Sequence, residues 1–272
     1  MKLSLSVRVA ESFTNKEKIS VPFAHLIALA RQYQMNAMCM RASVAGIQTP
    51  VEVVRDYRQQ LNAAGLPVSM VTGDFAVPVN GDAGPDCLRW ITPYLDLARE
   101  FNATLIRVCM KVEEDIYWAQ RAADEAKERG IRLAHQSHCA SMFESPENSL
   151  RVLKKVNRDN FGLIYEAANW FVAGERYGPD AIEMIRPYLF NVYVQNHRLN
   201  PNGQAKLDTW KRGVVGVDHI GIWEKDGVNY DQVLSTLAKA GYSGYVTIHQ
   251  AFAGVMPLEE SIRRSVEYLR RF

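Results

Sequence analysis

Eight short apolar runs recur along this chain, and a longer segment with helical periodicity follows each of them. The runs are continuous in apolar residues rather than alternating with polar ones, which is typical of parallel strands buried on both faces. Glycines end several of the longer segments, as at Gly65, Gly130 and Gly241. The expected strands are residues 3–9, 36–40, 66–71, 104–110, 131–135, 161–165, 189–194 and 245–249. The expected helices are residues 22–34, 50–64, 86–101, 113–129, 146–156, 179–186, 229–240 and 257–271.

Eight strands that alternate with helices predict a closed (β/α)8 barrel, the TIM-barrel fold of the α/β class. A length of 272 residues would allow two domains, but barrels of about 250 residues form one domain. We therefore expect a single domain over residues 1–272. An open doubly wound sheet is the alternative, and it is disfavoured because no glycine-rich phosphate turn follows the first strand.

Composition excludes several classes of protein. The net charge is +2 and no basic stripe is present, so nucleic-acid binding is not expected. No apolar run approaches the roughly eighteen residues of a membrane helix, and Arg8 interrupts an N-terminal stretch too short for a signal peptide. The four cysteines are scattered without a CxxC pair, which predicts reduced thiols in a cytoplasmic protein.

Polar residues gather where the expected strands end. In a (β/α)8 barrel the active site lies at the carboxyl ends of the strands, so these residues are the candidate site. Imidazole, carboxylate and amide oxygen together suit Mn2+, Co2+ or Zn2+ as ligands. Residues 198–225, after the seventh strand, are expected to form a long loop. The strand-end residues are Arg41, Asp74, His135, Gln136, His138, Glu166, Asn169, Gln195, Asn196, His197, His249 and Gln250.

Four segments, in this order, resemble those of a known family. They are IRLAHQSH, NFGLIYEAANWFVAGE, LFNVYVQNHRL and WEKDGVNYDQVLSTLAKAGYSGYVTIHQ, of which the last is the most specific. Through them the whole chain resembles the xylose isomerase-like barrel superfamily of sugar isomerases and epimerases. The superfamily includes the tagatose-3-epimerase, hydroxypyruvate isomerase and inosose dehydratase branches.

The resemblance implies a divalent metal held by Glu, Asp, His and Glu. The matching positions here are Gln136, Glu166, Gln195 and His249, and every one departs from the family residue. If the register of the seventh strand shifts, Tyr193 or His197 takes the place of Gln195. Either the metal has been lost, or the ligands have been permuted and the metal retained. The second explanation is favoured because Glu166 and His249 are strong ligands and both glutamines offer amide oxygens. Mn2+ is the expected ion, with Co2+, Mg2+ and Zn2+ as alternatives.

In the family the two glutamate ligands act as the bases, and here Gln136 and His249 replace them. Glutamine cannot carry a proton at neutral pH, so the base must be an imidazole. His138 matches the family's histidine and is the first choice, with His249 and Glu166 as the other catalytic candidates. The expected substrate contacts are Arg41, Asp74, His135, Asn169, Asn196, His197 and Trp223.

The expected function is a metal-dependent isomerase or epimerase of a keto-sugar or related carbohydrate. It would remove a proton next to a metal-bound carbonyl and form an enolate. A lyase of the same superfamily, a dehydratase or a C-glycoside deglycosidase acting by β-elimination, is the alternative, and a non-catalytic barrel subunit without metal is a second one. A small-molecule carbohydrate is the expected partner, and a homo-oligomer and a complex with a small partner subunit both remain open.

Overall fold

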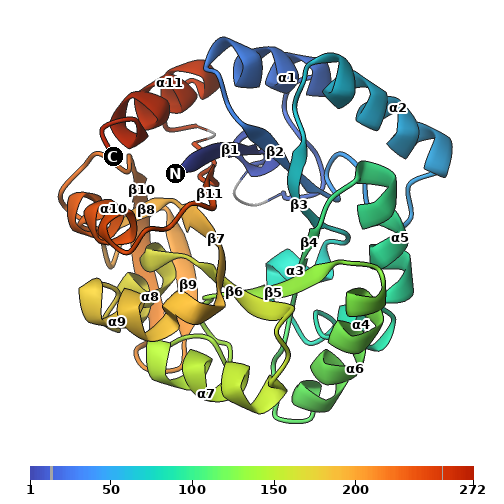
Figure 1. Cartoon of the computed structure of the whole chain (residues 1–272). Helices are drawn as coiled ribbons and strands as arrows, with labels where there is room; N and C mark the ends of the chain where they lie inside the picture. The colour runs from blue at the N-terminus through green and yellow to red at the C-terminus, as the bar shows by residue number, and fades with distance from the viewer. Residues whose placement is uncertain (13–14, 253) are drawn as a thin grey trace.

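A closed barrel of eight parallel strands forms the centre of the molecule, and helices surround it (Figure 1). The computed structural model describes residues 1–12, 15–252 and 254–272. The first strand pairs with the last, Leu3 opposite Val246, which closes the barrel and confirms the expected (β/α)8 fold. The barrel strands are β1 (Lys2–Ser6), β2 (Ala37–Arg41), β3 (Val68–Thr72), β4 (Leu105–Val108), β5 (Arg132–Gln136), β6 (Phe161–Tyr165), β7 (Leu189–Val194) and β11 (Tyr245–Ile248).

The larger helices pack their apolar faces against the outside of this barrel. Ser145 caps the helix that follows β5, because its hydroxyl accepts a hydrogen bond from the backbone N–H of Asn148 at 3.2 Å. The expected helix 86–101 is divided in two, since Pro93 in the first turn of its second half has no N–H to continue a helix. These helices are α1 (Phe23–Gln32), α2 (Val51–Ala63), α4 (Asp86–Arg89), α5 (Thr92–Phe101), α6 (Asp115–Glu128), α7 (Pro146–Val156), α9 (Pro179–Ile185), α10 (Tyr230–Lys239) and α11 (Leu258–Leu269).

The first strand is shorter than residues 3–9. The hydroxyl of Ser6 accepts a hydrogen bond from the backbone N–H of Arg8 at 3.2 Å. This bond caps a 3-10 helix, η1 (Val7–Ala10), in place of further strand. The turn brings Arg8 to the carboxyl end of the barrel, where it lines a cavity.

Residues 198–225 form more than a loop. A three-stranded antiparallel sheet of β8 (Asn196–Leu199), β9 (Ala205–Thr209) and β10 (Gly213–Ile220) follows β7. Two short helices were also unexpected, α3 (Ala76–Val79) and α8 (Ala167–Ala173), and a 3-10 turn, η2 (Arg186–Tyr188), precedes β7. The added sheet and α3 bring residues to the same cavity at the carboxyl end of the barrel. Within the described ranges, none of the helices combines the length and apolar character needed to cross a membrane.

Candidate functional site

The barrel interior is built in two layers, one apolar and one polar. A buried cluster inside the barrel takes one side chain from each of β2 to β7: Cys39, Met70, Leu105, Ala134, Ile164 and Tyr193. Residues two apart on a strand point to the same face. The next inward position along each of these six strands is polar: Arg41, Thr72, Arg107, Gln136, Glu166 and Gln195. His249, two residues beyond Thr247 of β11, joins this layer.

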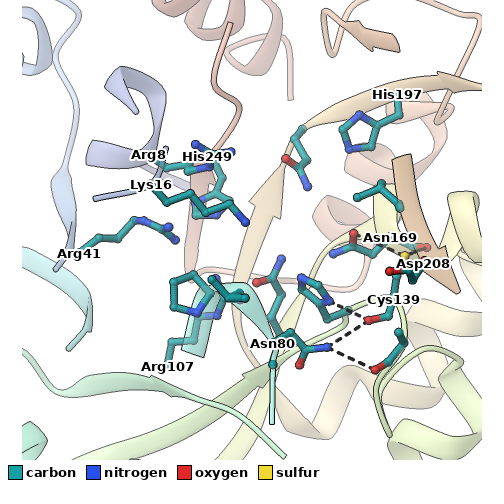
Figure 2. Close-up of a pocket in the computed structure, with 18 of the residues that line it drawn as sticks. Arg8, Lys16, Arg41, Asn80, Arg107, Cys139, Asn169, His197, Asp208 and His249 are labelled. Atoms are coloured by element: carbon teal, nitrogen blue, oxygen red, sulfur yellow. Dashed lines mark hydrogen bonds between the residues drawn. The ribbon is translucent and has the colours of Figure 1, made fainter. Parts of the chain in front are cut away.

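A cavity of about 400 Å3 lies over the polar layer. Figure 2 shows two sides of it, with Arg8, Arg41 and Arg107 on one side and Asn169 and Asp208 on the other. The volume lies within the usual range of small-molecule sites, about 300–1,000 Å3. The side chains that line the cavity are Arg8, Lys16, Arg41, Pro78, Val79, Asn80, Arg107, Lys111, Gln136, His138, Cys139, Ala140, Asn169, Gln195, His197, Lys206, Leu207, Asp208 and His249, together with Gly81.

Glu166 is fully buried beneath two amides. One of its carboxylate oxygens accepts a hydrogen bond from Nε2 of Gln136, and the other accepts one from Nε2 of Gln195. Burial raises the pKa of Glu166 to about 7, and the two amide donors and the nearby Arg107 only partly oppose that rise. Both glutamines line the cavity whereas Glu166 does not. Glu166 therefore acts on a bound ligand indirectly, by orienting the two amides that contact it.

The His138 imidazole lines the cavity as a neutral ring. Burial and the charge of Arg107 lower its pKa to about 3. Its Nδ1 lies 2.8 Å from the carbonyl oxygen of Cys139, which can only accept a hydrogen bond. Nδ1 therefore carries the proton and Nε2 carries the lone pair. The ring has the tautomer that a proton acceptor needs.

The His249 imidazole lines the same cavity. Its ring stacks on Tyr193 with centroids 3.7 Å apart, and its Nδ1 lies 3.1 Å from the hydroxyl of Ser6. Burial, together with the charges of Arg41 and Arg107, lowers the pKa of His249 well below its ordinary value. The ring is thus neutral and fixed in orientation.

Positive charge dominates the cavity wall. Arg8, Lys16, Arg41, Arg107, Lys111 and Lys206 line it, and among the described lining residues Asp208 is the one acidic side chain. Lys111 is committed elsewhere, since its ammonium donates to the carbonyl oxygens of Asn80 at 2.8 Å and Ala140 at 3.0 Å. The remaining excess of positive side chains over negative ones favours an anionic ligand over a cation.

The donor set does not fit a divalent metal. Across the described ranges, no three His, Cys, Asp or Glu side chains come together as a metal site. Both oxygens of Glu166 already accept amide protons, and arginines surround His249. Oε1 of Gln136 is buried and accepts no hydrogen bond from the described residues. It and Oε1 of Gln195 are neutral amide oxygens beside a cationic wall, whereas a divalent ion favours charged oxygen ligands.

Three of the expected substrate contacts line the cavity: Arg41, Asn169 and His197. The amide of Asn169 donates to the carbonyl oxygen of Ser137 at 2.8 Å. His197 lies in β8 with its Nδ1 3.1 Å from Nδ1 of His219. Burial lowers the pKa of His197 to about 3, so this ring is neutral as well.

The other four expected contacts, Asp74, His135, Asn196 and Trp223, do not line the cavity. His135 precedes the inward Gln136 by one residue and so faces outward, where its ring stacks on Phe143 with centroids 4.0 Å apart. The expectation that it contacts the substrate therefore has no support in the structure.

Asp74, Asn196 and Trp223 hold loops in place. Asp74 accepts hydrogen bonds from the backbone N–H of Val77 at 2.9 Å and from the hydroxyl of Tyr94. Asn196 donates to the carbonyl oxygen of Gly221 at 3.1 Å, which fixes the segment after β10. The ring of Trp223 packs 6.4 Å from that of Phe252.

The sequence interpretation missed the cationic residues, above all Arg8, Lys16 and Arg107. Arg107 had a visible signal, because it is a charged residue inside the apolar run ATLIRVCM. Arg8 likewise follows an apolar run directly. Lys16 lies in an irregular segment, and nothing in its sequence surroundings marks it.

Comparisons with known proteins agree with this architecture. A search of curated protein sequences gave no match. The probable 3-DHS dehydratase AsbF from Bacillus anthracis is 13% identical over 99% of both chains, with a TM-score of 0.73. A D-allulose 3-epimerase from Methylomonas sp. is 13% identical, with a TM-score of 0.69 over 100% of this chain and 97% of that one.

A third solved structure is a xylose isomerase-like TIM barrel protein from Mycobacterium smegmatis in complex with magnesium. It is 15% identical over 99% of this chain and 97% of that one, with a TM-score of 0.69. At these identities the likeness shows the fold alone. The family model for the xylose isomerase-like TIM barrel matches residues 28–272, and the chain therefore belongs to the xylose isomerase-like TIM barrel family.

Proposed function

We propose that this protein is an isomerase or epimerase that moves a proton on a small carbohydrate bound in the barrel-end cavity. The observation that carries the proposal is the pair of neutral, oriented imidazoles, His138 and His249, which line one cavity over a polar layer of amides. Two proton carriers beside one substrate are what such a reaction requires. Structures with similar folds include an epimerase and a probable dehydratase.

His138 takes the proton in this proposal. Its Nε2 has the lone pair, and it removes a proton from the carbon next to the substrate carbonyl. The negative charge that develops on the enolate oxygen is stabilised by the summed positive field of the cavity wall. The His138 imidazolium then returns this proton to the adjacent carbon, and His249 passes the hydroxyl proton from one substrate oxygen to the other. Gln136 and Gln195, oriented by Glu166, hold the carbonyl and hydroxyl groups.

Elimination begins with the same proton removal, so a lyase is the alternative reaction. The metal-dependent form of the isomerase, with Mn2+ at the polar layer, is a second candidate. One observation favours it, the buried Oε1 of Gln136 that accepts no hydrogen bond from the described residues. The arginines around His249 and the two occupied oxygens of Glu166 weigh against it.

A reducing compartment fits the chain. Cys39, Cys87, Cys109 and Cys139 are all buried and unpaired with one another. We place the protein in the cytoplasm on this ground.

Deuterium exchange tests the proposal directly. The protein is incubated in deuterated water with keto-sugars and with their carboxylate and phosphate derivatives, and carbon-bound deuterium is followed by NMR. Exchange without loss of a group is the expected result, and an unsaturated product would identify a lyase. Absence of exchange across the panel would contradict both and leave the non-catalytic barrel subunit.

A further inference from the structure

Arg107 is a buried guanidinium that forms no ion pair within the described part of the chain. It is 3% exposed, and its Nε is buried without a hydrogen-bond partner among the residues that the structure describes. Glu166 acts on it through its charge but forms no ion pair with it. Burial is the main reason that its pKa is lowered, and the neighbouring Arg41 lowers it further. An unpaired buried charge is costly, so a fold that keeps one without a compensating group is destabilised by it.

Arg107 also belongs to a cluster of like charges. Arg8, Lys16 and Arg41 lie on the same side of the cavity as Arg107, next to His249 (Figure 2). Burial lowers the pKa of Lys16 to about 8, and the charges of Arg8, Arg41 and Arg107 contribute to that lowering. The four side chains are therefore close enough to repel one another.

Two buried carboxylates, Glu11 and Glu166, act on this charge, and they are fewer than the four cations. Glu11 accepts hydrogen bonds from Nε and Nη2 of Arg41 at 2.8 and 3.1 Å and from Nη1 of Arg8 at 3.3 Å. One carboxylate thus serves two arginines. Lys16 and Arg107 form no ion pair with the rest of the described chain, and Asp208 lies on the far side of the cavity from them.

We propose that Arg107, Arg41, Arg8 and Lys16 bind an oxyanion carried by the substrate, so that the substrate is a sugar acid or a sugar phosphate rather than a neutral keto-sugar. The reaction it undergoes rests on the proposed function, but its binding does not. Arginine forks match the two oxygens of a carboxylate or phosphate, and such charge-assisted bonds are among the strongest hydrogen bonds.

The opposite wall suits the rest of such a molecule. Asn169 and His197 lie across the cavity from the cationic cluster, and Gln136 and Gln195 belong to the polar layer beneath. Amide and imidazole groups recognise hydroxyl and carbonyl oxygens without favouring a charge. A cavity of about 400 Å3 has room for a hexose derivative in this orientation.

Calorimetry at low salt tests the inference with three probes: D-glucuronate, D-glucose 6-phosphate and D-glucose. At least one acidic probe is expected to bind about tenfold or more tighter than glucose, and its affinity is expected to weaken as salt is added. Binding of glucuronate alone identifies a carboxylate, and binding of the phosphate alone identifies a phosphoryl group. Equal affinity for all three probes, or no binding of either acid, would overturn the inference.

Arg107→Met is the decisive variant, and Arg31→Met, at an exposed position of α1, is its matched control. We expect Arg107→Met to weaken binding of the acidic probe at least about tenfold and the control to bind as wild type does. If Arg107→Met does not fold, Arg107→Lys, which keeps the charge and loses the fork, is expected to show a smaller loss. Unchanged affinity in whichever Arg107 variant folds would refute the assignment.

These outcomes separate the two proposals. Binding of an acid through Arg107 without any deuterium exchange would leave the oxyanion site standing and remove the proposed reaction. Deuterium exchange into neutral keto-sugars, with no preference for acids, would support the proposed reaction and remove the oxyanion site.

Discussion

The side-chain amide of Gln136 donates a hydrogen bond to the fully buried carboxylate of Glu166. Gln195 donates to the other oxygen of the same carboxylate. Three of the four positions that the family resemblance assigns to metal ligands are thereby joined in one internal hydrogen-bonded group. The two amide donors stabilise the charged form of Glu166, and no ion pair joins Glu166 to the cationic side chains of the cavity wall among the described residues.

The titration of Glu166 is expected to appear in the stability of the protein. Its pKa is raised from 4.5 to about 7 in the folded state, so its contribution is present at low pH and is lost as pH rises through 7. Relative to Glu166→Gln, wild type should lose about 2 to 3 kcal/mol of unfolding free energy between pH 5 and pH 8. Urea unfolding of both proteins measures this, and a difference that does not vary with pH would contradict it.

Buried histidines should make the protein sensitive to acid. Burial lowers the pKa of His135, His138 and His197 to about 3 and that of His219 to about 4. Because these pKa values are depressed, the stability they provide is present above about pH 6.5 and is lost as pH falls.

Each of these four buried imidazoles adds up to about 1.4 kcal/mol per pH unit to the fall of the unfolding free energy. Unfolding free energy should therefore fall sharply between about pH 6 and pH 4, and more gently in His135→Gln. His25→Gln, at an exposed position, should follow wild type. A flat profile over this interval would show that the rings titrate normally.

Arg107→Met is expected to stabilise the fold while it impairs binding. Methionine is similar in length and removes an unpaired buried charge, so unfolding free energy should rise by about 1 to 4 kcal/mol. Thermal and urea unfolding measure this, with Arg31→Met as the control. A loss of stability would instead assign Arg107 to the structural core.

Substitution of the proposed base should remove turnover and spare binding. His138→Gln keeps a polar side chain in the cavity but has no titratable nitrogen, so exchange should fall at least about 100-fold. Affinity for the acidic probe should change little, because the oxyanion binds on the side of Arg107. His25→Gln is the matched control. Full activity in His138→Gln would transfer the role to another group.

The barrel could be predicted from the sequence because its strands are apolar on both faces and regularly spaced. The polar strand ends were equally visible, and Gln136, Glu166, Gln195 and His249 all lie in the interior layer. The sequence did not show whether His135 or Gln136 faces the barrel interior. One residue of register decides which of them faces inward, and only the closed barrel fixes that register.

The cationic side of the cavity was harder to predict. Arg107 follows the interior residue Leu105 by two positions, so its inward direction depends on knowing which face Leu105 occupies. Lys16 is brought in by tertiary structure alone. The sheet over residues 196–220 was missed because Gly213 and Gly216 weaken the alternating pattern of β10.

Deuterium exchange by metal-free protein tests the central claim most directly. After chelation, and with metal content checked by elemental analysis, the protein is assayed in deuterated water with an acidic keto-sugar. The account predicts the same exchange rate before and after chelation and no gain when Mn2+ is added. Exchange that disappears with the metal and returns with Mn2+ would contradict it, and would restore Gln136, Glu166, Gln195 and His249 to the role of ligands.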